Sequence, residues 1–519
     1  MTTIRANWVV GVGTLIAAVA VGCGSGDSTE QDAGQQDTGT GGGGQGGNAG
    51  AGGGAGAGET PQCKTNEDCE NSSAVDGKFC RPDGRCASKV FETVWNIPAT
   101  DRTLILPFVD FFAASAEPCD FTILWGDEGA GNDFSKGTTV TNCNKEKNRT
   151  HVYSAAGTYH IKIIGTYKNW GTMMKGWSTD CKMDCNANPL RFLTEVVSFG
   201  PVGLASKAFA CTNDVKFPED EVPDASLWHH GNETFSCAGK ISQAITKWDT
   251  SQLTDMSWMF YGVSSFNLPL TSWNAANVTN MTGMFAGAEA FNQPLDSWDT
   301  SKVKSTSHMF DGASAFNQPI NSWNTASVTD MRGMFKNATS FNQPLDSWNT
   351  AEVVYMDEMF QGASAFNQPI NSWDTLSVTS IASMFDGASA FNQPLDSWNT
   401  SKVTDMHNVF QDATSFNHPL NSWITVRVRK ITNMFQGTTS FNQPLDSWNT
   451  SNITNMLQAF KNASSFDQAL TSWDVSNVNI IDNIFANSGL TQPNYCAMIS
   501  KDDWKAKKDD LGVSFSCSP

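Results

Sequence analysis

The most regular feature of the chain is an apolar pattern that repeats every 25 residues. The motif Phe-Asn-Gln-Pro-Leu, or a close variant of it, begins at Phe266, Phe291, Phe316, Phe341, Phe366, Phe391, Phe416, Phe441 and Phe466. A tryptophan recurs at the same spacing from Trp248 to Trp473. A fixed period of this length is typical of stacked repeat proteins. With a degenerate first copy at Ile241, the pattern predicts about ten coils over residues 241–490.

The apolar spacing inside one repeat predicts a strand followed by a short helix. In the copy that begins at Phe391, the first half contains a proline and offers one leucine and one tryptophan to the interior, as a short strand would. From Val403 onward, apolar residues stand at positions i, i+3, i+6 and i+7, which is one face of a helix, and Thr400 or Ser401 is its expected N-cap. One repeat buries too little surface to offset the entropy of ordering it, so the repeats are expected to stack.

The positions that stay constant from repeat to repeat are predicted to be structural. Phe, Trp and Met at fixed phase are assigned to the core, and the alternative is a row of aromatic rings that stacks on sugars. The constant polar positions are assigned to backbone hydrogen bonding, with Asn292, Asn317 and Asn342 in a buried amide ladder and Asp299, Asn324 and Asn349 at the helix starts. Constant residues are therefore poor candidates for a binding site.

The positions that vary between repeats are the candidates for recognition. The exposed ones are expected to include Lys302, Lys304, Arg332, Glu352, Tyr355, Glu358, Lys402, His407, Arg427, Arg429 and Lys430. The candidate ligand-binding surface consists of Arg427, Arg429, Lys430, Tyr355, Glu358 and His407. Its first three members are the basic cluster of the repeats, for which a solvated helix face without a ligand is the alternative.

The repeat has the consensus W-[ND]-T-S-x-V-T-x-M-x-x-M-F-x-x-A-x-x-F-N-Q-P-L. It strongly resembles the 25/26-residue surface-protein repeat of BspA-like leucine-rich-repeat bacterial lipoproteins, and the resemblance covers residues 241–490. It implies an LRR-like α/β solenoid. It also implies a cell-surface role in adhesion or protein binding.

Residues 88–200 have a different pattern. Alternating apolar residues at 103–107, 121–125 and 159–165 predict strands. This region precedes a segment at 201–240 that contains cysteines and is expected to be a transition or N-terminal cap of the repeats.

Two motifs in this region resemble those of polycystic-kidney-disease-type (PKD-like) domains. They are Leu124–Gly129, similar to a W-G-D-G turn, and His151–Tyr159, similar to an H-x-Y-x-x-x-G-x-Y corner. The resemblance implies an Ig-like β-sandwich. Trp125 and Tyr159 are expected in its core, and Asp127 is expected to cap the turn, with calcium binding as the alternative.

The N-terminus has the pattern of an export signal. Arg5 precedes an apolar run at 8–21, which is too short to span a bilayer comfortably, so residues 1–22 are predicted to be a signal peptide. The sequence before Cys23 resembles a bacterial lipobox, which implies lipidation of Cys23; the alternative is an ordinary signal peptide with a stray cysteine. Gly24 favours the outer membrane, because an aspartate at that position is typical of inner-membrane retention. Residues 23–62 become almost pure Gly and Ala and are predicted to be a flexible tether.

The 13 cysteines are consistent with an oxidising compartment. Residues 63–87 are predicted to be a small module in which Cys63, Cys69, Cys80 and Cys86 form two disulfides of unknown pairing, with zinc binding as the alternative. Three further disulfides are expected among Cys119, Cys143, Cys181, Cys185, Cys211 and Cys237. Residues 491–519 break the repeat period and are predicted to form a C-terminal cap closed by Cys496 and Cys517.

The charge excludes two classes of partner. The chain has 33 Lys and Arg against 52 Asp and Glu, a formal net charge of -19. Nucleic acids and anionic lipid surfaces are bound by basic proteins, so neither is an expected partner, and the membrane is contacted only through the N-terminal lipid.

Catalysis has little support in the sequence. The seven histidines show no metal-ligand spacing, and the chain has no nucleophile elbow and no phosphate-binding glycine loop, so no enzyme activity, metal or cofactor is expected. The favoured function is adhesion or recognition of an extracellular protein or polysaccharide. The alternatives are an architectural envelope protein that self-associates and an extracellular hydrolase that uses residues 88–237 with the repeats as a targeting arm.

Overall fold

A computed structural model describes residues 78–80, 86–88, 90–107, 120–128, 136–140, 149–170, 188–200 and 202–517. Contacts divide the chain into two units, Met1–Glu59 and Thr60–Pro519. The predicted signal peptide, Cys23 and the tether lie outside the described residues, as do all but two short strands of the Cys-rich module.

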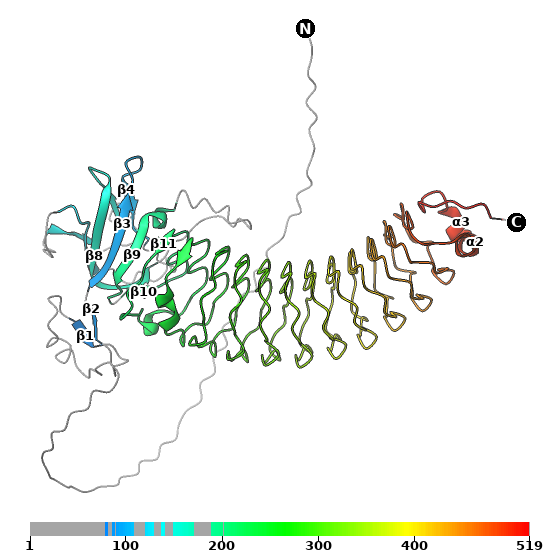
Figure 1. Ribbon diagram of the computed structural model, residues 1–519, viewed down its shortest axis with the longest axis horizontal. Coiled ribbons are helices and arrows are strands. Elements are labelled where there is room, and N and C mark those ends of the chain that lie inside the picture. Colours follow the sequence, from blue (N-terminus) through cyan, green and yellow to red (C-terminus); the bar gives the residue numbers. More distant parts are fainter. Residues whose placement is uncertain are drawn as a thin grey trace, which may run out of the picture. The chain divides into compact units, whose positions relative to one another are not determined.

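The N-terminal part of the second unit is built from strands (Figure 1). Its six-stranded sheet consists of β3 (Val90–Ile97), β5 (Asp120–Leu124), β6 (Thr138–Val140), β8 (Gly157–Trp170), β9 (Leu193–Ser198) and β10 (Val202–Leu204). The order is β6-β5-β8-β3-β9 with antiparallel neighbours, and β10 pairs with β8 in parallel.

Three further strand pairs accompany this sheet. They are β1 (Lys78–Cys80) with β2 (Cys86–Ser88), β4 (Thr103–Ile105) with β7 (Thr150–Val152), and β11 (Asp214–Val215) with β12 (Lys240–Ile241). The described residues also contain the short 3-10 helices η3 (Pro189–Phe192), η4 (Ala225–Leu227) and η5 (Gln243–Lys247). The three strands expected from apolar alternation are confirmed as β4, β5 and β8.

The core of this sheet differs from the expected one at one tyrosine. Trp125 is buried as predicted, but Tyr159 is only half-buried. Tyr153 is buried in its place, and its hydroxyl donates a hydrogen bond to the carbonyl of Trp125 at 3.0 Å. The Tyr159 hydroxyl instead donates to the Ala155 carbonyl, so it stays at the rim of the core.

Beyond the sheet, the chain forms a stack of repeated units (Figure 1). Each unit contributes one residue to a continuous row of parallel β-bridges: Asp255, Asn280, Ser305, Asp330, Tyr355, Ser380, Asp405, Lys430, Asn455 and Ile480. These residues are 25 positions apart, so the predicted stacking of repeated units is confirmed. We call this row the bridge column.

The prediction of a helix in each repeat is wrong. Residues 249–490 are all described and contain no α-helix. In residues 306–313, the amides of Thr306, His308, Phe310 and Gly312 donate to carbonyls of the next unit at 2.7–3.0 Å. The amides of Met309, Asp311 and Ala313 donate to the carbonyl three residues back, as in a turn. Half of the amides therefore pair between units, and the apolar spacing follows a period of three rather than 3.6.

The expected strand and N-cap are also corrected. The bridge column lies in the second half of the repeat, whereas the half that begins with Phe391 forms no strand. The amide of Ser401 donates to Oδ1 of Asn399 at 3.0 Å, which closes an Asx turn instead of starting a helix.

The constant aromatic residues form the core of the stack, as predicted. The repeat Phe, Trp and Met side chains are at most 4% exposed. Phe285, Phe310 and Phe335 stack on one another with ring centroids 5.6 and 5.8 Å apart. From Trp298 to Trp473, each indole N–H donates to a Leu or Ile carbonyl of the preceding unit at 2.9–3.2 Å.

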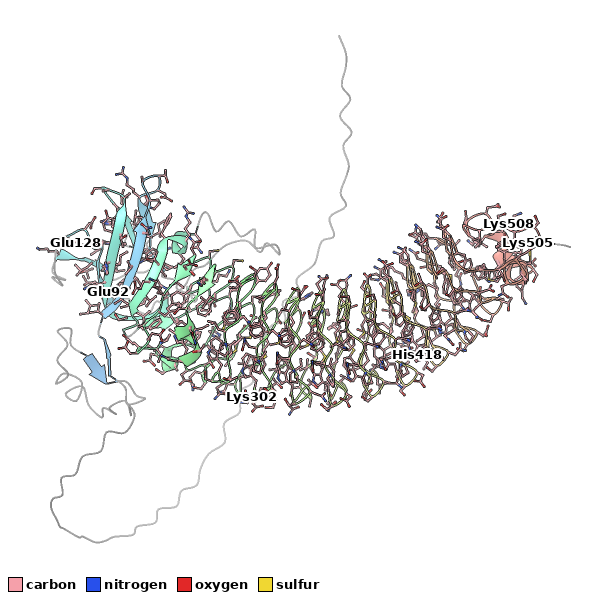
Figure 2. All side chains as sticks on the ribbon, viewed as in Figure 1. Glu92, Glu128, Lys302, His418, Lys505 and Lys508 are labelled. Carbon is pink, nitrogen blue, oxygen red and sulfur yellow. A yellow bond between two sulfur atoms is a disulfide. The ribbon has the colours of Figure 1, made fainter. Side chains whose placement is uncertain are left out.

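The asparagine ladder is confirmed, although it lies nearer the surface than predicted. Oδ1 of Asn292 accepts the amide of Asn317 and Nε2 of Gln318, both at 3.0 Å. Asn317 accepts the amide of Asn342 in the same way. These asparagines are half-buried. His418, labelled in Figure 2, replaces the glutamine of its unit and places Nε2 3.1 Å from the Asn392 carbonyl.

Both ends of the stack are covered. Upstream, β9 pairs with the segment around Lys216, and a hydrophobic cluster continues from the sheet into the repeats. Downstream, α2 (Gln492–Ile499) and α3 (Asp502–Ala506) follow the last unit. The amide of Phe485 donates to the Leu511 carbonyl, and the ring of Trp504 lies 6.1 Å from that of Phe485. The cap therefore satisfies backbone groups that another unit would otherwise satisfy.

Candidate functional site

The varied positions of the repeat gather around the bridge column. Its members differ in chemistry from unit to unit, and so do the residues two positions further on: Ser257, Thr282, Ser307, Arg332, Asp357, Ala382, His407, Thr432, Leu457 and Asp482. We call these two rows together the bridge face. Tyr355, His407 and Lys430 of the candidate surface lie on it, and Glu358 lies next to it. The fold thus brings together residues that are up to three units apart.

Tyr355 is held by an arginine of the preceding unit. The guanidinium of Arg332 lies 4.9 Å from the ring centroid of Tyr355. Nε and a terminal nitrogen of Arg332 also donate to both carboxylate oxygens of Asp330 at 2.6–3.2 Å. The hydrogen bonds with Asp330 raise the pKa of Arg332. The Tyr355 side chain is 43% exposed, so it is positioned but still accessible.

Glu358 takes part in a polar network rather than standing free. Its carboxylate accepts from Nζ of Lys336 at 2.6 Å. Nearby, Nε2 of Gln361 donates to Asp386 at 2.8 Å. Burial raises the pKa of Asp386, the Gln361 hydrogen bond opposes that rise, and the negative charges of Asp412 and Glu358 add to it. This part of the surface is therefore acidic, and its Glu358 and Asp386 carboxylates already have hydrogen-bond partners within the protein.

His407 and Lys430 share one carboxylate. Nδ1 of His407 lies 2.8 Å from Asp405 Oδ1, and Nζ of Lys430 lies 3.9 Å from Asp405 Oδ2. The hydrogen bond with Asp405 raises the pKa of His407 against the opposing effect of burial. Burial raises the pKa of Asp405, but the hydrogen bonds from His407 prevail and hold it below its usual value. The predicted His407 and Lys430 are thus one ionic group with Asp405.

Arg427 and Arg429 precede the bridge position of their unit and are exposed. Among the described residues, no ion pair reaches either guanidinium. The basic cluster therefore divides into one paired cation, Lys430, and two unpaired ones.

Sequence reasoning missed a set of exposed aliphatic side chains beside these arginines. Leu376, Ile424 and Val426 are 48%, 45% and 41% exposed. The signal was present in the sequence, because Leu376 and Val426 replace a serine or alanine of the repeat and Ile424 replaces an aspartate or asparagine.

The predicted turn cap at Asp127 is corrected. Asp127 Oδ2 lies 2.7 Å from Nε2 of His151. The carboxylate of Glu128, a residue labelled in Figure 2, accepts the amides of Trp125 and Gly126 at 2.7 and 2.8 Å. Glu128 therefore caps the turn. No cluster of His, Cys, Asp and Glu among the described residues could hold a metal ion.

Four of the described cysteines are disulfide-bonded. Cys496 and Cys517 form a disulfide that ties α2 to the C-terminal segment. Cys211 and Cys237 are also disulfide-bonded. Cys63, Cys69, Cys119, Cys143, Cys181 and Cys185 lie outside the described residues. Within the described part of the chain, no helix is both long and apolar enough to cross a bilayer.

The fold and the face define a repeat protein with a constant core and a varied surface. One family matches the chain at residues 230–346, 318–423 and 392–497, and it is described as "Mycoplasma protein of unknown function, DUF285". Together these matches span 230–497, more than half of the 519 residues, so the chain belongs to this family. No curated protein and no solved structure matches the chain.

Proposed function

We propose that the protein is a non-enzymatic recognition module of the cell surface that binds an extracellular protein or polysaccharide through its repeats. One observation carries the proposal. Every unit commits its constant residues to the core and to backbone hydrogen bonds, while varied residues such as Tyr355, His407 and Lys430 lie on the bridge face. Repeat proteins commonly bind partners through such extended surfaces. A catalytic or cofactor role is not part of the proposal.

The finer architecture belongs to the same proposal. The repeats form a BspA-like solenoid of ten 25-residue coils, preceded by a PKD-like β-sandwich and a small disulfide-linked module at 63–87. The 25-residue spacing of the bridge column supports the coils. The sheet around β8 and the pair β4–β7 support the sandwich.

The proposed location is the bacterial cell envelope, with Cys23 lipidated and the outer membrane as the anchor. The lipobox-like sequence and the Gly-rich segment after it support this assignment. A tether of that composition would let the repeats reach away from the membrane.

The test is a binding assay with the full chain against extracellular proteins and polysaccharides, over a range of salt concentrations. We expect saturable binding that falls by about tenfold in the double variant Tyr355→Ser with His407→Ser. Asp446→Ser is the matched control. It substitutes an exposed residue that lies away from the bridge face, so it should leave binding unchanged.

Either of two experimental results would favour a different function. Absence of binding together with concentration-dependent sedimentation would favour the architectural, self-associating alternative. Turnover of an extracellular polymer that survives loss of repeat binding would favour the hydrolase alternative.

A further inference from the structure

Ile424 departs from a hydrogen-bonding pattern that the equivalent residue keeps in the other units. In each of the other units from Asp249 to Asp474, an aspartate or asparagine stands at this position and accepts the amide two residues further on, at 2.9–3.1 Å. Ile424 has no such acceptor, so its unit forgoes the hydrogen bond to the amide of Val426. A residue that breaks a local rule without a compensating structural gain is a candidate functional residue.

The same edge carries two more exposed aliphatic side chains. Leu376 and Val426 occupy the position that is serine or alanine in the other units. The backbones of these units are directly linked, since the Thr375 hydroxyl binds the Asn399 backbone and the Thr400 hydroxyl binds that of Ile424. Neighbouring exposed apolar groups are typical of interaction sites.

Cations flank these aliphatic groups. Lys402 and Arg427 occupy one row of the stack, and Arg429 lies two residues beyond Arg427. In the described part of the chain, none of the three forms an ion pair. This concentration of unpaired positive charge is unusual in a chain of net charge -19.

We propose that this edge docks an extended, acidic segment of another polypeptide that carries widely spaced aliphatic side chains. We define the basic–aliphatic edge by six residues: Leu376, Lys402, Ile424, Val426, Arg427 and Arg429. The inference rests on the proposed recognition function and names the partner of one part of the surface.

The spacing of the units fits an extended peptide that crosses them. The ring of Trp398 lies 6.4 Å from that of Trp373 and 6.4 Å from that of Trp423, which measures the separation of neighbouring units beneath the edge. Alternate side chains on one face of a strand are about 6.6 Å apart. A peptide that runs along the stack can therefore place one side chain on each unit.

The chemistry of three successive units then sets the sequence of the peptide. Leu376 and Val426 stand roughly two spacings apart, with Ser401 and Lys402 on the unit between them. An aliphatic residue at every fourth position would meet the two apolar sites, and an acidic residue midway would meet Lys402. Arg427 and Arg429 would pair with the remaining carboxylates.

A polypeptide fits better than a polysaccharide. An acidic polysaccharide would neutralise the cations but would leave Leu376, Ile424 and Val426 without apolar groups to cover them. The only strongly exposed aromatic ring of the described repeats, Tyr355, lies on the bridge column and not on this edge.

The test uses the full chain and a synthetic peptide with Leu at every fourth position and Glu elsewhere, followed by fluorescence anisotropy. The comparison probes are the same composition with the leucines adjacent, the same pattern with Lys for Glu, and polyglucuronate. We expect saturable binding of the first peptide, at least about tenfold tighter than that of any comparison probe.

The variants separate binding from folding. Ile424→Asn restores the Asx turn, so it should raise the thermal unfolding midpoint and still weaken peptide binding. Leu376→Ser with Val426→Ser should weaken binding by about tenfold. Arg427→Gln with Arg429→Thr should weaken it and flatten its salt dependence. The matched controls Lys302→Gln and Val152→Thr change the same chemistry away from this edge and should have no effect.

The outcomes keep the two proposals apart. Equal binding of polyglucuronate or of the rearranged peptide, or insensitivity to the edge variants, would overturn the docking proposal. Binding to extracellular targets without binding to the peptide would overturn it as well, while the recognition function stands. Binding to the peptide alone would support the edge and contradict the broader function.

Discussion

At the scale of single residues, the positive-φ position three residues after the bridge column explains an alternation between neighbouring units. His308 has φ 54° there, and the equivalent residue of the next unit is Gly333, with φ 55°. A Cβ on Gly333 would lie 2.5 Å from Nδ1 of His308. Trp258 lies over Gly283 in the same manner. The two rings at this position, Trp258 and His308, are therefore each followed by a glycine in the next unit, so the alternation runs from Trp258 to Gly333.

Gly333→Ala should lower the free energy of unfolding by about 2–3 kcal/mol, because it combines a positive φ with a clash against His308. Gly312→Ala is the matched control: its φ is 71°, but the nearest atom to its new Cβ would be 3.7 Å away, so it should lose only about 1 kcal/mol. Denaturant unfolding of both variants measures the difference. Equal losses would show that the contact with His308 does not matter, and His308→Gly should rescue most of the difference if it does.

The pair His407–Asp405 makes a pH-dependent contribution to stability. Because Asp405 raises the pKa of His407, the stabilisation is fully present below the usual histidine value of about 6.5 and is lost as the pH rises through the higher pKa of the folded state. His407→Gln should remove this loss. Thermal unfolding midpoints of the wild type and the variant should diverge below neutral pH and converge above it.

Asp405→Asn provides the complementary test, since it removes the carboxylate that holds the His407 proton. It should abolish the same pH dependence. A pH profile unchanged by either substitution would contradict the assignment.

At the scale of the structural element, the sequence predicted which residues are buried better than it predicted the local conformation. The Phe, Trp and Met columns and the partners of Asn292 followed from position within the repeat. The conformation of residues 306–313 did not, because alternate amides pair with the next unit and a single repeat does not contain their partners. An apolar spacing that suits a helix also suits consecutive three-residue turns.

The asparagine ladder gives a prediction at this scale. Oδ1 of Asn342 accepts the amide of Asn367 and Nε2 of Gln368 at 2.9 and 3.0 Å. Asn342→Ala should lower the free energy of unfolding by about 1–2 kcal/mol, because it leaves two donors without this acceptor. Asn342→Asp keeps the acceptor and should lose less, as measured by denaturant unfolding. Equal losses in the two variants would argue that the ladder contributes through packing and not through hydrogen bonds.

At the scale of the whole chain, the repeats begin earlier than the sequence pattern suggested. The amide of Phe209 donates to the Thr234 carbonyl, and that of Phe235 donates to the Met259 carbonyl, as in later units. Phe235 lies 25 residues before Phe260, but Phe209 lies 26 residues before Phe235, and neither unit carries the Phe-Asn-Gln-Pro-Leu motif, so a search for that motif does not find them. Their signal is a buried phenylalanine at nearly the same spacing as Phe260.

Only part of the candidate surface could be predicted from the sequence. Departures from the repeat identified Tyr355, His407 and Lys430, and the fold places all three on the bridge face. Their ionic partners could not be inferred, because Asp405 and Lys430 meet only when units stack. The aliphatic residues at the basic–aliphatic edge were overlooked because apolar residues were assumed to be core.

The contacts that cover both ends of the stack affect how copies of the chain can associate. The C-terminal cap occupies the backbone of Phe485, and β9 pairs upstream with the segment around Lys216. End-to-end stacking of copies would have to displace these contacts. The sides of the stack remain the surfaces on which a partner can bind.

The most direct test of the central claim is site-specific photo-cross-linking of the full chain to a target found in the binding assay. A photo-reactive phenylalanine analogue would replace Tyr355 on the bridge face, Leu376 on the basic–aliphatic edge, or Gln293 on the asparagine ladder. The account predicts cross-links to the target from positions 355 and 376 and none from position 293. Cross-links of equal yield from position 293, or cross-links only between copies of the chain, would contradict it.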